Sequence, residues 1–258
     1  RRVIASLALR RYPRLALPIL AATLLAWILA ASGLMHNAAA ARANGDGWLG
    51  YFYQFDMSFV GALRFSLFDV FFDYDLSRSY NGALWTMPIE LAGSFIVFAL
   101  CMVLREPRWR AAILALAFIV CAATVHGFRA FIIGMAIALF YDAMRHRSHL
   151  QGALRLLPWA LFGAAIAYST LSSPEGGALV ARRTTATLLA ASAIVLAVTL
   201  SPGLQRSFAN PLSRYLGSIS FPLYLVHLPV LCSAGSLIFV VLLDSGTGLS
   251  TRYAHMTA

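Results

Sequence analysis

Residues 81–100 have the sequence NGALWTMPIELAGSFIVFAL, which begins with polar side chains and ends as a largely apolar run. The run predicts a membrane-spanning helix, and Glu90 lies several residues inside it. An ionisable side chain in a span costs roughly 2.5–3.5 kcal/mol on insertion scales, so Glu90 is expected to face a bundle interior or a water-filled cavity. Glu90 is therefore a candidate functional residue.

A purely structural role for Glu90 is the alternative, in which it pairs with a buried Arg or Trp donor and holds two helices together. Asn81 and Trp85 precede Glu90 by nine and five residues. At about 3.6 residues per turn they need not share its face. We expect both at the helix entrance, where Trp is common at membrane interfaces for structural reasons.

The composition excludes a soluble domain. The chain has 258 residues, of which 60% are hydrophobic and 12% charged, and its mean hydropathy is +0.75. Its segments are continuously apolar rather than alternating, which favours helices over a transmembrane barrel. The three cysteines lie in apolar runs without metal-ligand spacing, so no metal site is predicted: Cys101, Cys121 and Cys232.

The fold class predicted is all-α, a polytopic transmembrane helix bundle in one domain over residues 1–258. About seven apolar segments approach the roughly 20 residues that cross a bilayer. They are 15–35, 83–104, 110–125, 128–143, 154–171, 184–200 and 217–243. Residues 36–80 hold aromatics, including Trp48, Tyr51, Tyr53 and Phe55, among acids and short apolar runs. This segment is expected to form interfacial or re-entrant pieces that fold back over the bundle.

We interpret the net charge of +10 as a signal of membrane topology rather than of nucleic-acid binding. All 20 basic residues are Arg, and placing residues 1–14 in the cytoplasm puts 13 of them inside and 7 outside. That bias satisfies the positive-inside rule. Because the sequence begins at Arg1 without a signal peptide, an N-terminal portion is expected to be missing.

A second constellation lies in the segment LGSISFPLYLVHLPV, residues 216–230. Its His227 falls near mid-membrane, where histidine is as unusual as glutamate. Ser220, Tyr224 and His227 have i, i+4 and i+7 spacing and are expected on one helix face. The alternative is a His that hydrogen-bonds a neighbouring helix while Tyr224 only packs.

Arg10, Arg11 and Arg14 form a basic group at the cytoplasmic mouth of the first span. Guanidinium groups bind phosphate bidentately, so the group is a candidate site for the phosphates of a nucleotide-bearing donor. Plain topology signalling and contact with lipid headgroups are the alternative. No Walker loop, dinucleotide fingerprint or Gly-x-Ser-x-Gly elbow occurs, which argues against soluble-type nucleotide and hydrolase chemistry.

Four motifs in this order resemble the membrane-bound acyltransferase 3 family: Arg10 to Leu15 (RRYPRL), Asn81 to Ser94, Phe131 to Gly134, and Leu216 to His227. The resemblance covers nearly the whole chain. It implies about ten spans and transfer of an acyl group, often acetyl, from cytoplasmic acyl-CoA to a hydroxyl of a sugar, surface glycan, lipid-linked sugar or similar acceptor. Family members carry an Arg and a His in a first span that this chain lacks, along with the second span.

The resemblance also suggests roles for the candidates. Arg10, Arg11 and Arg14, at the Arg-rich turn, would bind the donor phosphates. Asn81, Trp85 and Glu90 would position the acceptor or a catalytic His. Ser220, Tyr224 and His227 would line the transfer channel, with His227 a candidate base. Glu90 and His227 are the catalytic candidates. The expected cosubstrate is acyl-CoA, most simply acetyl-CoA, and no bound cofactor is expected.

Two other functions remain open from the sequence. In a proton-coupled transporter or flippase of a glycan or small solute, Glu90 and His227 would form a proton relay, although the internal repeat symmetry typical of transporters is missing. The second alternative is that the chain is an inactive fragment. The expected location is a bacterial inner membrane, with membrane lipids as neighbours and cell-envelope polysaccharide O-acetylation as the setting.

Overall fold

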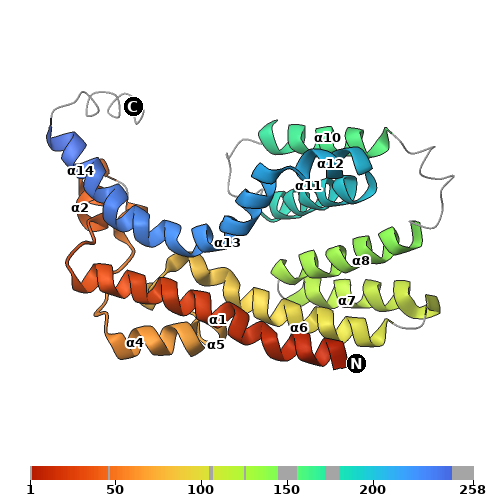
Figure 1. Cartoon of the computed structure of the whole chain (residues 1–258), viewed down its shortest axis with the longest axis horizontal. Coiled ribbons are helices and arrows are strands. Elements are labelled where there is room, and N and C mark those ends of the chain that lie inside the picture. The colour runs from red at the N-terminus through yellow and green to blue at the C-terminus, as the bar shows by residue number, and fades with distance from the viewer. Residues whose placement is uncertain are drawn as a thin grey trace. The chain divides into compact units, whose positions relative to one another are not determined.

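The computed structural model describes residues 2–45, 47–104, 107–124, 126–144, 156–171 and 180–245, and every regular element in them is helical (Figure 1). The α-helices are α1 (Arg2–Ala31), α2 (Asn37–Asn44), α3 (Gly47–Gly50), α4 (Phe59–Arg64), α5 (Val70–Phe72), α6 (Met87–Val103), α7 (Arg110–Thr124), α8 (Arg129–Met144), α10 (Leu157–Leu171), α11 (Val180–Leu200), α12 (Pro202–Phe208), α13 (Pro211–Val230) and α14 (Ser236–Asp244). The all-α prediction is confirmed for these residues.

Three helices in the described residues are long and apolar enough to cross a membrane: Ile4–Ala31, Gly82–Val103 and Pro211–Asp244. A fourth results if Ala186–Leu200 and Pro202–Phe208, which meet at 100°, count as one broken span. The break has a local cause, because Ser201 caps a new helix through Leu204 N and Pro202 occupies its first turn.

The prediction of about seven spans is not confirmed. Two of the expected segments form shorter apolar helices, Arg110–Cys121 and Leu157–Ser169. A third, α8, has 16 residues. At 1.5 Å per residue these helices fall short of a hydrocarbon core of about 30 Å. Apolar composition alone did not reveal where each helix ends.

The predicted basic turn before the first span is wrong. Arg10, Arg11 and Arg14 lie within α1, which continues through Pro13 and Pro18. The apolar residues of Val3–Leu9 already support helix formation, and proline is tolerated in transmembrane helices. The first span therefore begins earlier than residue 15.

The chain divides into two compact units. One consists of residues 1–92 and 218–258. In it, α1 packs against α4 and the π-helical turn Phe65–Asp69, and α14 packs against α2 (Figure 1). Its core is a set of buried apolar side chains: Leu15, Ala16, Ile19, Ala22, Ala62, Phe65, Val70, Phe71, Tyr80, Leu84, Met87, Leu91 and Leu225. Residues 36–80 thus fold as short helical pieces, and their interfacial or re-entrant position stays a prediction.

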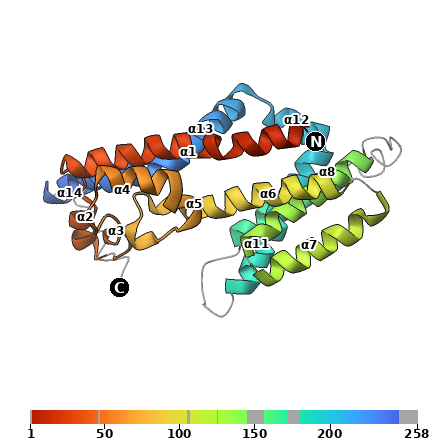
Figure 2. The same cartoon turned by 90° about the horizontal axis from the view of Figure 1, so that it is seen from below.

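The other unit consists of residues 93–217. In it, α7 packs against α8 (Figure 2), α8 packs against α11, and α11 packs against α10 and α12. Leu100, Leu104, Cys121 and Ile132 form its buried cluster. The unit also contains the Phe131–Gly134 motif, at the start of α8.

Two π-helical turns provide carbonyl acceptors for other parts of the first unit. In Phe65–Asp69, the carbonyl of Leu67 accepts from the Tyr12 hydroxyl on α1. In Leu231–Gly235, the carbonyl of Cys232 accepts from the His36 backbone N–H at 2.9 Å. Such turns interrupt the regular i→i−4 pattern. The first turn therefore joins the 36–80 segment to α1, and the second joins it to the candidate span Pro211–Asp244.

Candidate functional site

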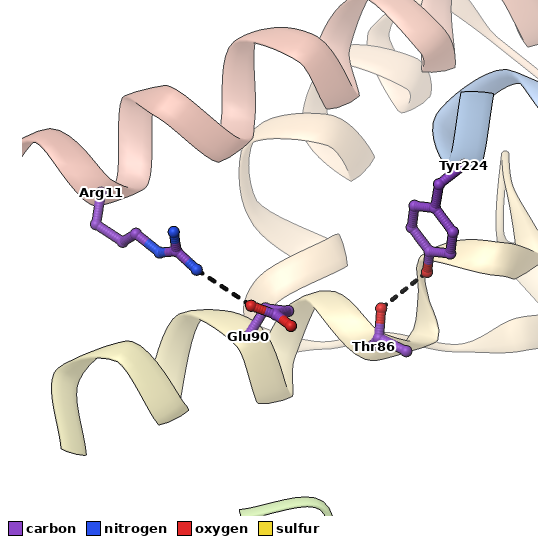
Figure 3. Close-up of polar contacts among 4 residues, drawn as sticks. All are labelled: Arg11, Thr86, Glu90 and Tyr224. Atoms are coloured by element: carbon purple, nitrogen blue, oxygen red, sulfur yellow. Dashed lines mark hydrogen bonds and ion pairs between the residues drawn. The ribbon is translucent and has the colours of Figure 1, made fainter. Parts of the chain in front are cut away.

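Glu90 forms an ion pair with Arg11 (Figure 3). Arg11 Nη2 on α1 lies 3.1 Å from Glu90 Oε2 in the first turn of α6. The two side chains are 30% and 45% exposed, so the pair is neither deeply buried nor fully solvated. The acid that appears anomalous in an apolar run is thereby compensated. The same contact joins two candidate spans, as the structural alternative for Glu90 required.

Thr86 and Tyr224 form the second polar contact (Figure 3). Thr86 precedes Glu90 by four residues in the sequence. The hydroxyl oxygens of Thr86 and Tyr224 are 2.8 Å apart. Since Tyr224 donates its single hydroxyl proton to the Ala83 carbonyl, Thr86 is the donor to the Tyr224 oxygen. This arrangement fixes Tyr224 of α13 against the entrance of α6.

Thr86 is the one member of this group to which the sequence assigned no role. Its signal was available, because a position four residues before an intramembrane acid falls near the same helix face. A threonine hydroxyl also commonly bonds to its own helix, so spacing alone would not have singled it out.

Asn81 is fully buried and occupies the entrance predicted for it. Its Oδ1 accepts from Ala83 N at 3.1 Å and caps the 3₁₀ turn Gly82–Thr86 that leads into α6. Its Nδ2 donates to the Leu225 carbonyl of α13 at 2.6 Å. The amide is thus engaged within the protein. Trp85, in the same turn, is 59% exposed.

His227 is exposed on α13, and its ring lies 5.9 Å from the ring of Tyr224. Its Nδ1 lies 2.7 Å from the Tyr224 backbone carbonyl. A carbonyl oxygen only accepts, so Nδ1 carries the proton of the neutral ring. The lone pair is then on Nε2. This tautomer is the one that a general base requires at Nε2.

The remaining candidates lie on the surface of the described structure. Arg10 and Arg14 are exposed, and four residues separate them on α1, so they share a face. Ser220 is exposed on α13, one turn before Tyr224. Within the described residues, no three His, Cys, Asp or Glu side chains are placed to hold a metal ion. The roles predicted for these residues stay predictions.

Comparison with known proteins places the chain in a family. A family described as an acyltransferase domain (Acyl_transf_3) matches residues 1–248. The chain is also similar to the O-acetyltransferase PaAT-1 of Phomopsis amygdali, with 30% identity over 210 residues, which are 67% of this chain and 41% of that protein. The chain thus spans less than half the length of this relative. No solved structure matches. The match over nearly its whole length shows that the chain belongs to the acyltransferase 3 family.

Proposed function

We propose that this chain is part of an integral-membrane O-acyltransferase that moves an acyl group, most simply acetyl, from cytoplasmic acyl-CoA to a hydroxyl of a sugar, glycan or similar acceptor. The observation that carries the proposal is the Arg11–Glu90 pair beside the Thr86–Tyr224 contact, on candidate spans of a family member. Uncharged polar contacts alone would serve packing equally well. A charged pair within spans is a functional-site candidate by default.

The donor would bind at the cytoplasmic end of α1. Arg11 is paired with Glu90, whereas Arg10 and Arg14 are exposed on one face of α1. Planar guanidinium groups bind phosphate oxygens bidentately. We therefore assign the CoA phosphates to Arg10 and Arg14, with Arg11 holding Glu90 and completing the basic group.

In the transfer step, the acceptor hydroxyl loses its proton to a base as its oxygen bonds to the thioester carbonyl carbon. The carbon–sulfur bond then breaks, and the CoA thiolate takes up a proton. Nε2 of His227 is the candidate base in this chain because it carries the lone pair of the neutral ring. Ser220 and Tyr224 would line the channel, and Asn81, Trp85 and Glu90 would position the acceptor or a catalytic His.

The test measures transfer of labelled acetyl from acetyl-CoA to a glycan acceptor in membranes containing the full-length parent protein. Glu90→Gln and His227→Ala should each lower the rate at least about 100-fold, the lower range for loss of a positioned acid or base. Asp244→Asn and His36→Ala are matched controls, because they remove an acid and an imidazole elsewhere in the same unit.

A charge swap separates chemistry from helix pairing. The double variant Arg11→Glu with Glu90→Arg retains an ion pair between α1 and α6 but moves the carboxylate to the other helix. If Glu90 acts in the reaction, the swap stays inactive. Wild-type transfer in the swap would show that the pair only joins helices. Proton-coupled solute uptake without any acyl-CoA turnover would overturn the proposed activity.

A further inference from the structure

A polar cavity of about 330 Å³ lies in the first unit, and its described lining residues all fall within 55–80. It is separate from the Arg11–Glu90 contact and lies in the segment between the first two candidate spans. Its volume is at the small end of the roughly 300–1,000 Å³ typical of ligand pockets. It would therefore hold a small ligand or one end of a larger one.

The cavity gathers much of the acidity of a basic chain. Four of the ten Asp and Glu residues line it, namely Asp56, Asp69, Asp73 and Asp75, with Arg64 and Arg78 as the only cations among its described lining residues. Lining charge is therefore −2, from four acids and two bases, in a chain of formal charge +10. An electronegative pocket favours cationic ligands and disfavours anionic ones.

The free charges can be distinguished from the paired ones. Arg64 Nε lies 3.2 Å from Asp69 Oδ1, so these two charges compensate each other. Hydrogen bonds from the hydroxyl and backbone N–H of Ser77 hold the pKa of Asp75 below its ordinary value, so Asp75 is ionised at neutral pH. Asp56 and Asp73 are exposed, and neither carboxylate has a hydrogen bond or ion pair among the described residues.

The carboxylates are spread around the cavity rather than converging on one point. No group of three acidic, His or Cys side chains in the described part of the chain is close enough to hold a metal ion. Distributed carboxylates instead suit a ligand with several separated donors, such as hydroxyl and ammonium groups, because an ionised carboxylate only accepts hydrogen bonds.

Aromatic side chains form the other part of the wall. Phe55 is half-buried and packs edge-on against Tyr80, with ring centroids 5.2 Å apart. Tyr80 Oη is held by the backbone N–H and carbonyl of Ser58, at 3.0 and 2.9 Å. A Cβ at Gly61 would lie closer than 3.0 Å to that hydroxyl. The glycine thus leaves the space that the Tyr80 ring and its bonds to Ser58 require.

We propose that this cavity binds the acceptor, and that it selects a hydroxyl-rich acceptor bearing a protonated amine, such as an amino sugar, over neutral and acidic sugars. Asp56 and Asp73 would receive the ammonium and hydroxyl donors, and Phe55 would contact the apolar face of the ring. Only the identification of the ligand as the acceptor rests on the proposed function. Ligand selectivity itself follows from the lining.

The experiment measures binding without an acyl donor, by saturation-transfer NMR on the full-length protein in detergent at a pH that keeps the amine protonated. The probes are methyl glucosaminide, methyl glucoside and methyl glucuronide. The expected order of affinity is glucosaminide, then glucoside, then glucuronide. Equal affinity for all three, tighter binding of the glucuronide, or no binding of the glucosaminide would overturn the proposal.

Three variants test the residues. Asp56→Asn with Asp73→Asn should weaken glucosaminide binding about tenfold, since one exposed ion pair accounts for up to about fivefold, and should change glucoside binding little. Arg78→Gln should tighten glucosaminide binding, an effect that misfolding would not produce. Asp244→Asn, an exposed acid outside the cavity, is the control. Unchanged affinity in the double variant, or weaker binding in Arg78→Gln, would contradict the assignment.

The two proposals fail separately. Selective glucosaminide binding by a protein that transfers no acetyl group would overturn the proposed activity and support the proposed binding site. If the Asp56→Asn, Asp73→Asn variant acetylates an amino-sugar acceptor at the wild-type rate, the proposed binding site is overturned and the proposed activity is supported.

Discussion

Asn81 Nδ2 donates to the Leu225 carbonyl at 2.6 Å, and this carbonyl is the one that Pro229 deprives of its helical donor. In a regular helix the N–H of residue 229 would bond to the carbonyl of residue 225. Proline has no N–H, so the acceptor is left open within α13. Leu225 is 2% exposed and Asn81 is fully buried. The asparagine therefore satisfies a defect created by a proline 148 positions away in the sequence.

This relationship predicts a coupling between Asn81 and Pro229. Asn81→Ala should lower the free energy of unfolding by about 1–3 kcal/mol, because it leaves a buried carbonyl without a donor. In a Pro229→Ala background, residue 229 regains its N–H and can satisfy that carbonyl, so the same Asn81→Ala change should cost at least about 1 kcal/mol less. Thermal unfolding of the four proteins in detergent measures the cycle.

Additive costs in the two backgrounds would contradict this account. Asn81→Asp is a useful companion, because it retains the acceptor that caps Ala83 N and removes the donor to Leu225. It should destabilise the wild-type background more than the Pro229→Ala background.

Much of this arrangement was predictable, because its signals are local. The polar entrance at Asn81, the apolar run after Glu90 and the i, i+4 spacing of Ser220 and Tyr224 follow from residue type and helical period. The donor from Asn81 to Leu225 was not, because it joins segments that neither period nor spacing relates. The Arg11–Glu90 pair was anticipated only as an unspecified Arg partner.

Helix length was the other part that sequence could not supply. Apolar stretches at 110–125 and 154–171 have the composition of spans but form short helices. Conversely, α1 contains two prolines and four arginines and extends toward the N-terminus beyond residue 15. Composition measures how much apolar surface a segment carries, whereas helix ends depend on caps and packing partners that become visible only in three dimensions.

Gly93 and Gly134 provide a prediction within the second unit. A Cβ at Gly93 would lie closer than 3.0 Å to the Phe131 ring, whereas one at Gly134 would meet nothing within 4 Å. We expect Gly93→Ala to destabilise the protein by about 1–3 kcal/mol through overpacking. Gly134→Ala should be neutral or stabilising by up to about 1 kcal/mol, since glycine is unfavourable inside a helix.

The cause can be tested by shrinking the ring. Phe131→Leu in the Gly93→Ala background should recover part of the lost stability, measured as the midpoint of thermal unfolding. A Gly93→Ala protein as stable as wild type, or one that Phe131→Leu only destabilises further, would exclude a steric clash as the cause.

Tyr53 and Tyr80 predict opposite effects for the same chemical change. The Tyr53 hydroxyl is buried and has no hydrogen-bond partner among the described residues. The Tyr80 hydroxyl both accepts from and donates to the Ser58 backbone. Tyr53→Phe should therefore stabilise the fold by up to about 1 kcal/mol, and Tyr80→Phe should destabilise it by a similar amount. Chemical unfolding of both variants at neutral pH makes the comparison, and equal signs would contradict it.

The same residue predicts an alkaline effect. Burial raises the pKa of Tyr53 above its ordinary value of 10.0. A raised pKa in the fold means that the unfolded chain ionises first, so the associated stability is present below pH 10.0 and is lost as the pH rises toward the folded pKa. Raising the pH from 9 to 11 should thus lower the free energy of unfolding of wild type more than that of Tyr53→Phe, by the amount that one titrating group contributes. Parallel pH curves would show that Tyr53 remains accessible to water.

Asp75 predicts the opposite dependence, at acid pH. Its pKa is lowered first by the Ser77 hydroxyl and then by the Ser77 backbone N–H. A lowered pKa stabilises the turn Leu76–Arg78 above the unfolded value of 3.8, and this contribution is lost as the pH falls through the folded pKa. Ser77→Ala removes the hydroxyl donor but keeps the backbone donor, so the pKa of Asp75 should rise partway toward its ordinary value. The chemical shift of the Asp75 carboxyl carbon, followed by NMR between pH 2 and 6 in a selectively labelled protein, measures the change. Ser245→Ala, a serine outside the cavity, is the control, and a titration of Asp75 that Ser77→Ala leaves unmoved would show that the hydroxyl does not set its ionisation.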